Sequence, residues 1–322
     1  MRAILIRNPT SGASPLANHT ASEPQDNIED HILETLKRLD IEPEVRYTSE
    51  EDPGEGIARE AARDAVELVI AAGGDGTLHS VATGLIGSNT VLGILPCGTM
   101  NNIARSLRIN EDIETACETI AHGKTSRIDV GSINGHIFLE VAGIGLEAEL
   151  FPAAEEIKSP GIRETWRGVL NGLKVLFTFK PERFKIRFDD GHTRTYRAIQ
   201  ISVCNSPFYG ARFQFAPTAI MDDGYLNALI YQNFSKLEYI LHAIAISQGR
   251  RVFAPKVKRR LIQTLAITSK APVTVHADGE PLGTTPVNIH VVKGALHVRI
   301  PEQMAYSPNV AQYQTITSAR RV

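Results

Sequence analysis

Short apolar runs alternate with longer segments of helical periodicity over the first 130 residues of the chain. Four short runs predict strands at 2–7, 44–47, 67–72 and 91–96. Apolar positions at helical spacing predict helices at 26–39, at 57–65, from residue 77, at 101–107 and at 112–123. Because strands separated by helices are joined by right-handed crossovers, this half predicts a parallel sheet.

The pattern changes after Asp129, where β-type runs replace most of the helices. Asn134-Gly135 lies between two such runs and predicts a tight hairpin, and Lys293-Gly294 predicts another between 287–292 and 295–300. Further strands are expected at 184–189, 196–204, 225–231, 265–269 and 273–277, with helices within 146–180 and 235–249. This half therefore predicts an antiparallel sandwich or barrel.

The predicted fold class is α/β plus β. Residues 1–130 form an N-terminal α/β domain with a parallel sheet, and residues 131–300 form a C-terminal antiparallel β-sandwich domain. Residues 301–322 either pack back on the first domain or fray. The 322 residues, of which 43% are hydrophobic and 22% charged, are sufficient for two soluble domains.

The net charge and the cysteine content limit the partners and the cellular compartment that we expect. The net charge of -2 provides no overall field for nucleic acid, so none is expected, and contact with an anionic membrane would need a local patch. The three cysteines have no paired spacing, and the apolar stretches are shorter than the ~20 residues needed to span a bilayer. We expect a cytoplasmic protein, and the sequence leaves both a monomer and a homodimer open.

Three loops of unusual composition follow predicted strands of the first half: NPTSG at 8–12, GGDGT at 73–77 and CGTMNN at 97–102. The carboxyl ends of parallel strands meet at one edge of a sheet, where ligands bind. Glycines there let backbone N–H groups approach phosphate oxygens, and Asp75 is expected to face Mg²⁺ carried by a nucleotide. The alternative for each single loop is an ordinary turn whose threonine caps a helix.

Two segments of the second half have two readings each. Asp278-Gly279-Glu280 is either a plain hairpin turn or the source of a carboxylate that accepts a hydroxyl proton during phosphoryl transfer. Residues 250–260 hold six cations interleaved with apolar residues that include Phe253. They form either a solvated loop or a patch that docks on anionic membrane, with Phe253 dipping into the interface.

Together, NPTSG, GGDGTLHSV, LPCGTMNNIAR, the CNSPFYG…MDDGYL run and the late DGE resemble the diacylglycerol kinase catalytic-domain family, which is related to sphingosine and ceramide kinases. The resemblance implies that ATP binds to the N-terminal domain and that the acceptor lipid lies in the cleft toward the β-rich domain. The matching nucleotide positions are Asn8, Pro9, Thr10, Ser11, Gly12, Thr48, Gly73, Gly74, Asp75, Gly76, Thr77, Leu78, His79, Thr99 and Asn101.

The resemblance also implies a catalytic base within Asp278-Gly279-Glu280, in addition to the catalytic Asp75. It implies a structural Mg²⁺ at Asp223 with backbone carbonyls at Ile220 and Tyr225. The sequence departs from the family pattern at two positions, since Asn102 stands where an aspartate is usual and His79 where an asparagine is usual.

The sequence therefore predicts an ATP-dependent lipid kinase that phosphorylates a hydroxyl of a membrane lipid such as diacylglycerol or a sphingoid lipid. An NAD kinase-like enzyme is disfavoured because LPCGTMNNIAR and the late DGE do not match that family. Asn102 keeps a non-catalytic nucleotide- or lipid-binding protein open.

Overall fold

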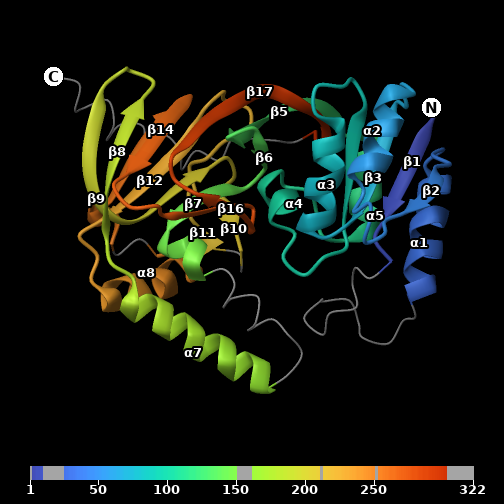
Figure 1. Cartoon of the computed structure of the whole chain (residues 1–322). Helices are drawn as coiled ribbons and strands as arrows, with labels where there is room; N and C mark the ends of the chain where they lie inside the picture. The colour runs from blue at the N-terminus through green and yellow to red at the C-terminus, as the bar shows by residue number, and fades with distance from the viewer. Residues whose placement is uncertain (1, 10–24, 151–161, 211–212, 251–252, 303–322) are drawn as a thin grey trace.

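A computed structural model describes residues 2–9, 25–150, 162–210, 213–250 and 253–302 (Figure 1). Its N-terminal half has four parallel strands, β1 (Ala3–Arg7), β2 (Glu44–Tyr47), β3 (Leu68–Gly73) and β4 (Val91–Pro96), in the order β4-β3-β1-β2. Every residue of β3 is buried, as its continuous apolar run predicts for a strand covered on both faces. The parallel sheet predicted for this half is confirmed.

The helices between these strands are α1 (Gln25–Arg38), α2 (Glu55–Arg63), α3 (Asp75–Leu85), α4 (Asn102–Ser106) and α5 (Ile113–His122). Helix α2 packs beside α3, and α1 packs beside α5. Buried residues of the strands and helices form one core. Helix α5 begins where the sequence places an N-cap, because the Asp112 carboxylate accepts the N–H of Thr115 at 2.9 Å.

The C-terminal half is built from antiparallel strands. They are β5 (Lys124–Ile133), β6 (His136–Phe138), β7 (Val141–Gly145), β8 (Glu182–Phe188), β9 (Thr193–Cys204), β10 (Phe208–Tyr209), β11 (Phe213–Gln214), β12 (Leu226–Gln232), β13 (Val257–Ile262), β14 (Thr264–Ser269), β15 (Thr274–Ala277) and β16 (Glu280–Thr284). Strand β8 shows the alternation of a half-buried strand, since Phe184, Ile186 and Phe188 are buried and the residues between them are exposed. The apolar faces enclose a second core.

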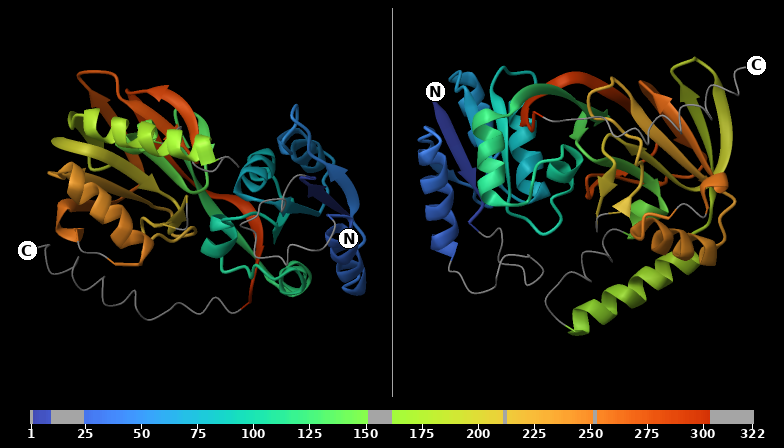
Figure 2. Two further views of the ribbon diagram at one scale, coloured as in Figure 1. Left: turned by 90° about the horizontal axis from the view of Figure 1, so that it is seen from below. Right: turned by 180° about the vertical axis from the view of Figure 1, so that it is seen from behind.

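Two helices cover the outer side of this sandwich, α7 (Ile162–Thr178) and α8 (Lys236–Ser247). Figure 1 and the right-hand view of Figure 2 show both helices below the strands. They enclose a third core with β9 and β12, to which Leu176 and Phe234 contribute. Helix α8 begins with a capping box, in which the Ser235 hydroxyl and the Glu238 carboxylate each accept a backbone N–H of the other residue. The predicted antiparallel sandwich is confirmed.

One strand, β17 (Val287–Ile300), belongs to both halves. It pairs with β14 in the sandwich, with β5 along its length and with β4 of the parallel sheet, so a single sheet of 15 strands runs through the described chain. The hairpin predicted at Lys293-Gly294 is therefore wrong: the strand continues through a register shift between Val292 and Leu296. The Asp129 carboxylate accepts the N–H of Gly294 at 2.7 Å and stabilises this bulge.

The other predicted hairpin is confirmed. Strands β5 and β6 pair across Asn134 (φ 49°) and Gly135 (φ 90°), the left-handed pair that a two-residue turn requires. The tail predicted to pack or fray begins at residue 301, and only Pro301 and Glu302 of it fall among the described residues. No helix within the described ranges is long and apolar enough to cross a membrane.

Candidate active site

The glycine loops that follow β1, β3 and β4 meet at one edge of the parallel sheet. Asn8 Nδ2 donates to Thr77 Oγ1 at 3.1 Å, which joins the first loop to the second. The second and third loops touch through their glycines, because a Cβ added at Gly98 would lie 2.4 Å from Gly74 Cα. Only residues without a side chain allow this approach. The predicted convergence of the loops is thus present, with Thr10, Ser11 and Gly12 outside the described residues.

The other predicted nucleotide positions differ in what they expose. The N–H of Thr48 donates to the Arg7 carbonyl at 2.9 Å, which places Thr48 at the end of β1 beside the loops. Gly76 faces open space, whereas the Leu78 side chain is buried in the core and leaves only its backbone near the loop. Gly73 packs closely on the Thr77 side chain, while Pro9 is exposed and Thr99 half-buried.

Asn101 holds the shape of the third loop. It adopts a left-handed conformation (φ 51°), and its buried side chain accepts the N–H of Gly98 at 3.0 Å and donates to the Gly98 carbonyl at 2.9 Å. Asparagine tolerates this backbone conformation better than most residues. The side chain is thus engaged with its own loop, so a role of Asn101 in nucleotide binding would come from shaping that loop.

Asp75 binds the first turn of α4. Its two carboxylate oxygens accept the N–H groups of Asn102 and Ile103, both at 3.1 Å. Burial raises the pKa of Asp75, and the two hydrogen bonds oppose that rise. The carboxylate expected to face nucleotide-borne Mg²⁺ therefore also connects the second loop to the third.

Carboxylates from both halves line a small cavity next to Asp75. The cavity has a volume of ≈60 Å³, room for a few water-sized groups, and its lining residues are Asp75, Gly76, His79, Glu140, Asp278 and Glu280. Asp75 and His79 come from α3 in the parallel half, whereas Asp278 and Glu280 come from the turn between β15 and β16. The predicted catalytic residues are therefore neighbours in space although about 200 residues separate them in sequence.

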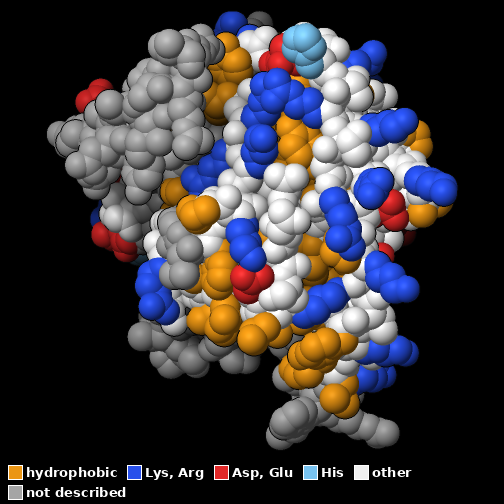
Figure 3. All heavy atoms as spheres, turned by 90° about the vertical axis from the view of Figure 1, so that its left-hand side faces the viewer, with side chains coloured by type: hydrophobic (Ala, Val, Ile, Leu, Met, Phe, Trp, Pro, Cys, Tyr) orange, Lys and Arg blue, Asp and Glu red, His pale blue; other side chains and the backbone are white. Residues whose placement is uncertain are grey.

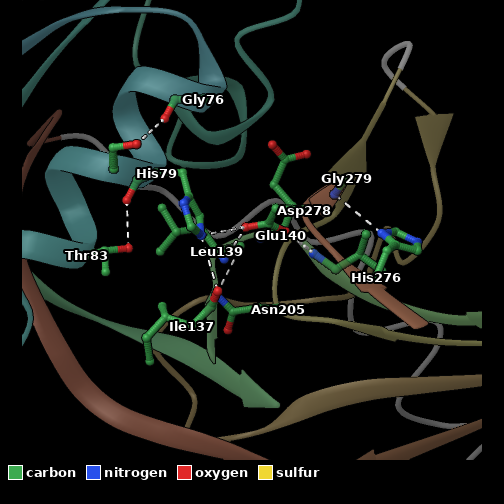
Figure 4. Close-up of polar contacts among 12 residues, drawn as sticks. Gly76, His79, Thr83, Ile137, Leu139, Glu140, Asn205, His276, Asp278 and Gly279 are labelled. Atoms are coloured by element: carbon green, nitrogen blue, oxygen red, sulfur yellow. Dashed lines mark hydrogen bonds and ion pairs between the residues drawn. The ribbon is translucent and has the colours of Figure 1, made fainter. Parts of the chain in front are cut away.

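Asp278 is fixed by backbone donors (Figure 4). Its Oδ1 accepts the N–H groups of Glu140 at 3.0 Å and Val141 at 2.8 Å, and its Oδ2 accepts that of Leu139 at 2.6 Å. Burial raises the pKa of Asp278, whereas the charge of His79 and the three N–H groups act in the opposite direction. A carboxyl with a raised pKa suits a general base, whereas Glu280 is exposed.

His79 connects the two halves at this cavity. Its Nε2 lies 3.2 Å from the Ile137 carbonyl oxygen and 3.7 Å from Asp278 Oδ2. In Figure 4 the imidazole extends from α3 toward the segment that holds Asp278. The predicted nucleotide-binding residue thus contacts the candidate base directly.

Sequence reasoning missed Glu140, a buried carboxylate of the same cavity. Asn102 Nδ2 donates to Glu140 Oε2 at 3.2 Å and to the Gly210 carbonyl at 2.9 Å. The signal available in the sequence was the single charged residue within the apolar run IFLEVAGIG. An isolated acid in a run predicted to be buried indicates a paired or functional group.

His276, a weaker candidate base on sequence grounds, lies behind the acidic turn together with Glu147, which the sequence did not indicate. His276 Nδ1 accepts the N–H of Gly279 at 3.3 Å, and its Nε2 lies 3.6 Å from Glu147 Oε1. Glu147 Oε2 accepts from Gln200 and from Ser202, and all four side chains are buried. This polar cluster supports the turn that carries Asp278 and Glu280, so His276 has a positioning role rather than the role of a base.

The predicted metal position is a tight turn between Ile220 and Tyr225. Asp223 Oδ1 accepts the N–H of Tyr225 at 2.9 Å, and Asp129 Oδ2 accepts that of Gly224 at 2.6 Å. Burial raises the pKa of Asp223, and the charges of Asp129 and Asp222 act in the same direction. A cation would favour the ionised form, and oxygen donors suit Mg²⁺. No cluster of three His, Cys, Asp or Glu side chains arranged for a metal occurs in the described parts of the chain. A site at Asp223 would thus depend on backbone carbonyls.

Comparison with known proteins matches two family models to the chain. Residues 2–133 match the diacylglycerol kinase catalytic domain, and residues 141–300 match the YegS C-terminal NAD kinase beta sandwich-like domain. A probable lipid kinase YegS-like of Klebsiella pneumoniae (strain 342) is 30% identical over 286 residues, which cover 87% of this chain and 93% of that protein. The chain belongs to the family of diacylglycerol kinases and YegS-like lipid kinases.

Other members of this family are similar over nearly the whole length. A diacylglycerol kinase of Bacillus subtilis (strain 168) is 27% identical over 94% of this chain and 98% of its own. The crystal structure of a diacylglycerol kinase from Bacillus anthracis str. Sterne, 22% identical, shares the fold with a TM-score of 0.70, over 93% of this chain and 96% of that chain. The resemblance inferred from the motifs is confirmed.

Proposed function

We propose that the protein is an ATP-dependent lipid kinase that transfers the γ-phosphoryl group of ATP to a hydroxyl of a membrane lipid. Diacylglycerol is the first acceptor to test, and a sphingoid lipid is the second. The observation that supports this most is the position of the Asp278-Gly279-Glu280 turn, whose carboxylates share one cavity with Asp75 beside the glycine loops. Phosphoryl transfer to an alcohol needs this pairing of a phosphate-binding edge with a proton acceptor.

The nucleotide would bind with its phosphates at the loops that follow β1, β3 and β4. Helix α3 directs its first N–H groups toward this edge, and Gly76 leaves open space in its first turn. Mg²⁺ carried by the phosphates supplies charge neutralisation. Asp75 and Glu140 are the carboxylates that would hold it.

Asp278 would accept the proton of the lipid hydroxyl. Its backbone donors keep the carboxylate in one orientation, and its raised pKa gives it more basicity than an exposed aspartate. The imidazole of His79 lies beside Asp278 Oδ2 and would therefore lie between the nucleotide loop and the base. Glu280 would orient the incoming hydroxyl from the exposed side of the turn.

Only part of the membrane patch expected at residues 250–260 is engaged in contacts within the protein, since Lys258 and Arg259 are exposed. Phe253 is half-buried against Phe234 and His242, and Arg251 lies outside the described residues. Lys256 pairs with Glu238 at 2.6 Å. The segment is also not a loop, because it forms a short helical turn and then β13.

Exposed apolar side chains collect instead on α7 and α8. These two helices expose Leu170, Leu173 and Phe177, and Leu237, Leu241 and Ile244. The spacing within each set places its members on one helical face. Figure 3 shows many Lys and Arg side chains on the face of the molecule that includes the exposed positions of β8 and β9. Apolar residues flanked by cations suit peripheral binding to anionic lipid.

The test is a kinase assay on purified protein with labelled ATP, Mg²⁺ and mixed micelles that contain one candidate lipid each. We expect phosphorylated lipid, identified by mass spectrometry, from wild type, and far less of it in the same time from Asp278→Asn. Formation of NADP from NAD under the same conditions would favour an NAD kinase instead. Binding of ATP without any phosphorylated product would favour a non-catalytic protein.

A further inference from the structure

A cavity of ≈420 Å³ lies at the C-terminal end of α4, whereas Asp75 of the second glycine loop binds the beginning of that helix. Its walls come from the end of α4, the beginning of β5, the last residue of β17 and residues within 207–208 and 214–222. None of the predicted catalytic or nucleotide-binding residues lines it. Its volume falls within the range of small-molecule sites.

The charged residues of this cavity are mostly cationic. Arg105, Arg108 and Lys124 line it, and Asp222 is its one acidic lining residue. Arg105 Nη2 donates to Glu111 Oε1 at 2.8 Å, and its guanidinium lies 5.6 Å from the centroid of the Phe208 ring. Its Nε has no hydrogen-bond partner among the described residues. Three cationic side chains and one carboxylate around one hollow leave an excess of positive charge, which favours an anionic ligand.

The backbone at Arg108 places its side chain at the rim of the cavity. Arg108 follows α4 in a left-handed conformation (φ 59°), while the N–H of Ile109 donates back to the Ala104 carbonyl at 2.9 Å. Glycine is the usual residue at this position of a helix terminus. The same turn ends α1 at Asp40 and α2 at Ala65, so the conformation alone does not indicate a ligand site.

The rest of the lining is largely apolar. Its apolar residues are Leu107, Ile128, Pro207, Phe208, Pro217, Ala219, Ile220, Met221 and Ile300. A simple anion would leave this surface without a partner, whereas a hydrocarbon chain would cover it. We propose that the cavity binds an anionic amphiphile, with a phosphate or carboxylate headgroup at Arg105, Arg108 and Lys124 and one hydrocarbon chain along the apolar wall.

Binding at this cavity would reach the candidate active site through α4. The helix is only five residues long: its first two N–H groups bind Asp75, and its last two residues, together with Leu107, line the cavity. A ligand that fixes the end of so short a helix also restrains its beginning. Binding of the amphiphile does not depend on the proposed kinase function. An effect on turnover does depend on it, and the phosphorylated lipid product is itself an anionic amphiphile.

The test measures binding by calorimetry, with decyl phosphate and decanoate at concentrations below micelle formation. Inorganic phosphate and neutral monodecanoylglycerol serve as the headgroup-only and chain-only probes. We expect wild type to bind at least one of the two anionic amphiphiles about tenfold or more tightly than either control probe. Preference between the two identifies the headgroup. Hydrogen exchange of the segment 102–108 should slow when the amphiphile binds, a readout that does not depend on activity.

Two variants and one control locate the site. Lys124→Gln and Arg108→Gly should each weaken binding by about tenfold or more, the worth of one charge-assisted hydrogen bond. Arg108→Gly should keep or raise the unfolding temperature, because glycine removes the left-handed strain. Lys37→Gln, on the exposed side of α1, should bind as wild type does. Absence of binding to wild type, equal binding by the cavity variants, or equal binding of a control probe would overturn the proposal.

Discussion

Asn102 Nδ2 donates a hydrogen bond to Glu140 Oε2 at 3.2 Å, and this buried pair joins the parallel half to the sandwich. The resemblance of the motif to the family leads us to expect an aspartate at position 102, and its carboxylate would face Glu140 with like charge. The amide provides a donor instead. The asparagine at position 102 therefore suits the neighbouring Glu140, because its amide can donate a hydrogen bond to that carboxylate.

Replacing Asn102 by aspartate should destabilise the protein. The variant loses a hydrogen bond to a buried charged group and sets two carboxylates against each other, so we expect the free energy of unfolding to fall by about 2 kcal/mol or more. Urea denaturation at neutral pH measures the change. The double variant Asn102→Asp with Glu140→Gln should recover much of the loss, since glutamine donates to the new carboxylate. A single variant as stable as wild type would show that the pair contributes nothing.

Alanine should have opposite effects at two glycines of the loops. At Gly98 its Cβ would lie 2.4 Å from Gly74 Cα, so backbone must move, and we expect a loss of about 1–3 kcal/mol in stability. At Gly76 the Cβ meets nothing within 4 Å and alanine favours the helix, so stability should rise by about 0.5–1 kcal/mol. If phosphates approach this turn, Gly76→Ala should nonetheless bind ATP more weakly. Thermal unfolding and ATP titration separate the two effects.

The base should be identifiable from turnover. Asp278→Asn should lower kcat by about 10²–10⁴-fold, the usual range for a positioned acid–base group, and Glu280→Gln should lower it less. ATP affinity should change little in both, because the turn belongs to the sandwich half. Wild-type kcat in both variants would reduce Asp278-Gly279-Glu280 to a hairpin turn.

Activity should depend on pH through Asp278. A base acts when deprotonated, and burial raises the pKa of Asp278, so kcat/KM should rise with pH at values above the ~3.9 of an ordinary aspartate. The charge of His79 lowers this pKa. His79→Asn should therefore move the acid limb to higher pH, and a profile that stays in place would separate His79 from the base. The pH profile of kcat/KM for both proteins provides the measurement.

Membrane binding should depend on the apolar face of α7 and α8. The triple variant Leu173→Ser, Phe177→Ser and Leu241→Ser should sediment poorly with liposomes rich in anionic lipid, since each change removes an exposed apolar anchor. Tyr47→Ser removes an exposed aromatic from the parallel half and is the control. Binding of wild type should weaken as salt rises, because the Debye length is only ~8 Å at physiological ionic strength. If the triple variant sediments as wild type does, the apolar face of α7 and α8 does not bind the membrane and another surface does.

The local order of strands and helices was predictable because it depends on local pattern. Strand 91–96 and the Asn134-Gly135 turn follow directly from apolar runs and turn chemistry. The meeting of the glycine loops followed from a general property of parallel sheets, namely that successive strands end at one edge. Both the fold and the meeting of the glycine loops were thus accessible without coordinates.

What could not be predicted depends on partners distant in sequence. Lys293-Gly294 has hairpin chemistry, and only Asp129 and the neighbouring β5 make it a bulge. The partner of Asn102 is 38 residues away. The six cations of 250–260 gave no sign that Phe253 would join an aromatic cluster with Phe234. Composition reveals which groups are present, whereas tertiary packing decides what they face.

Strand β17 restricts how the two halves of the molecule move. Fourteen residues of one strand are hydrogen-bonded to β14 at one end and to β4 at the other, with β5 alongside. A wide hinge opening between the halves would break these hydrogen bonds. Twisting of the β5–β17 ribbon at its bulge leaves the ladder intact. The acidic turn and the glycine loops would therefore approach each other by rotation about the ribbon, with Asp129 at the pivot and Asp223 in the turn beside it.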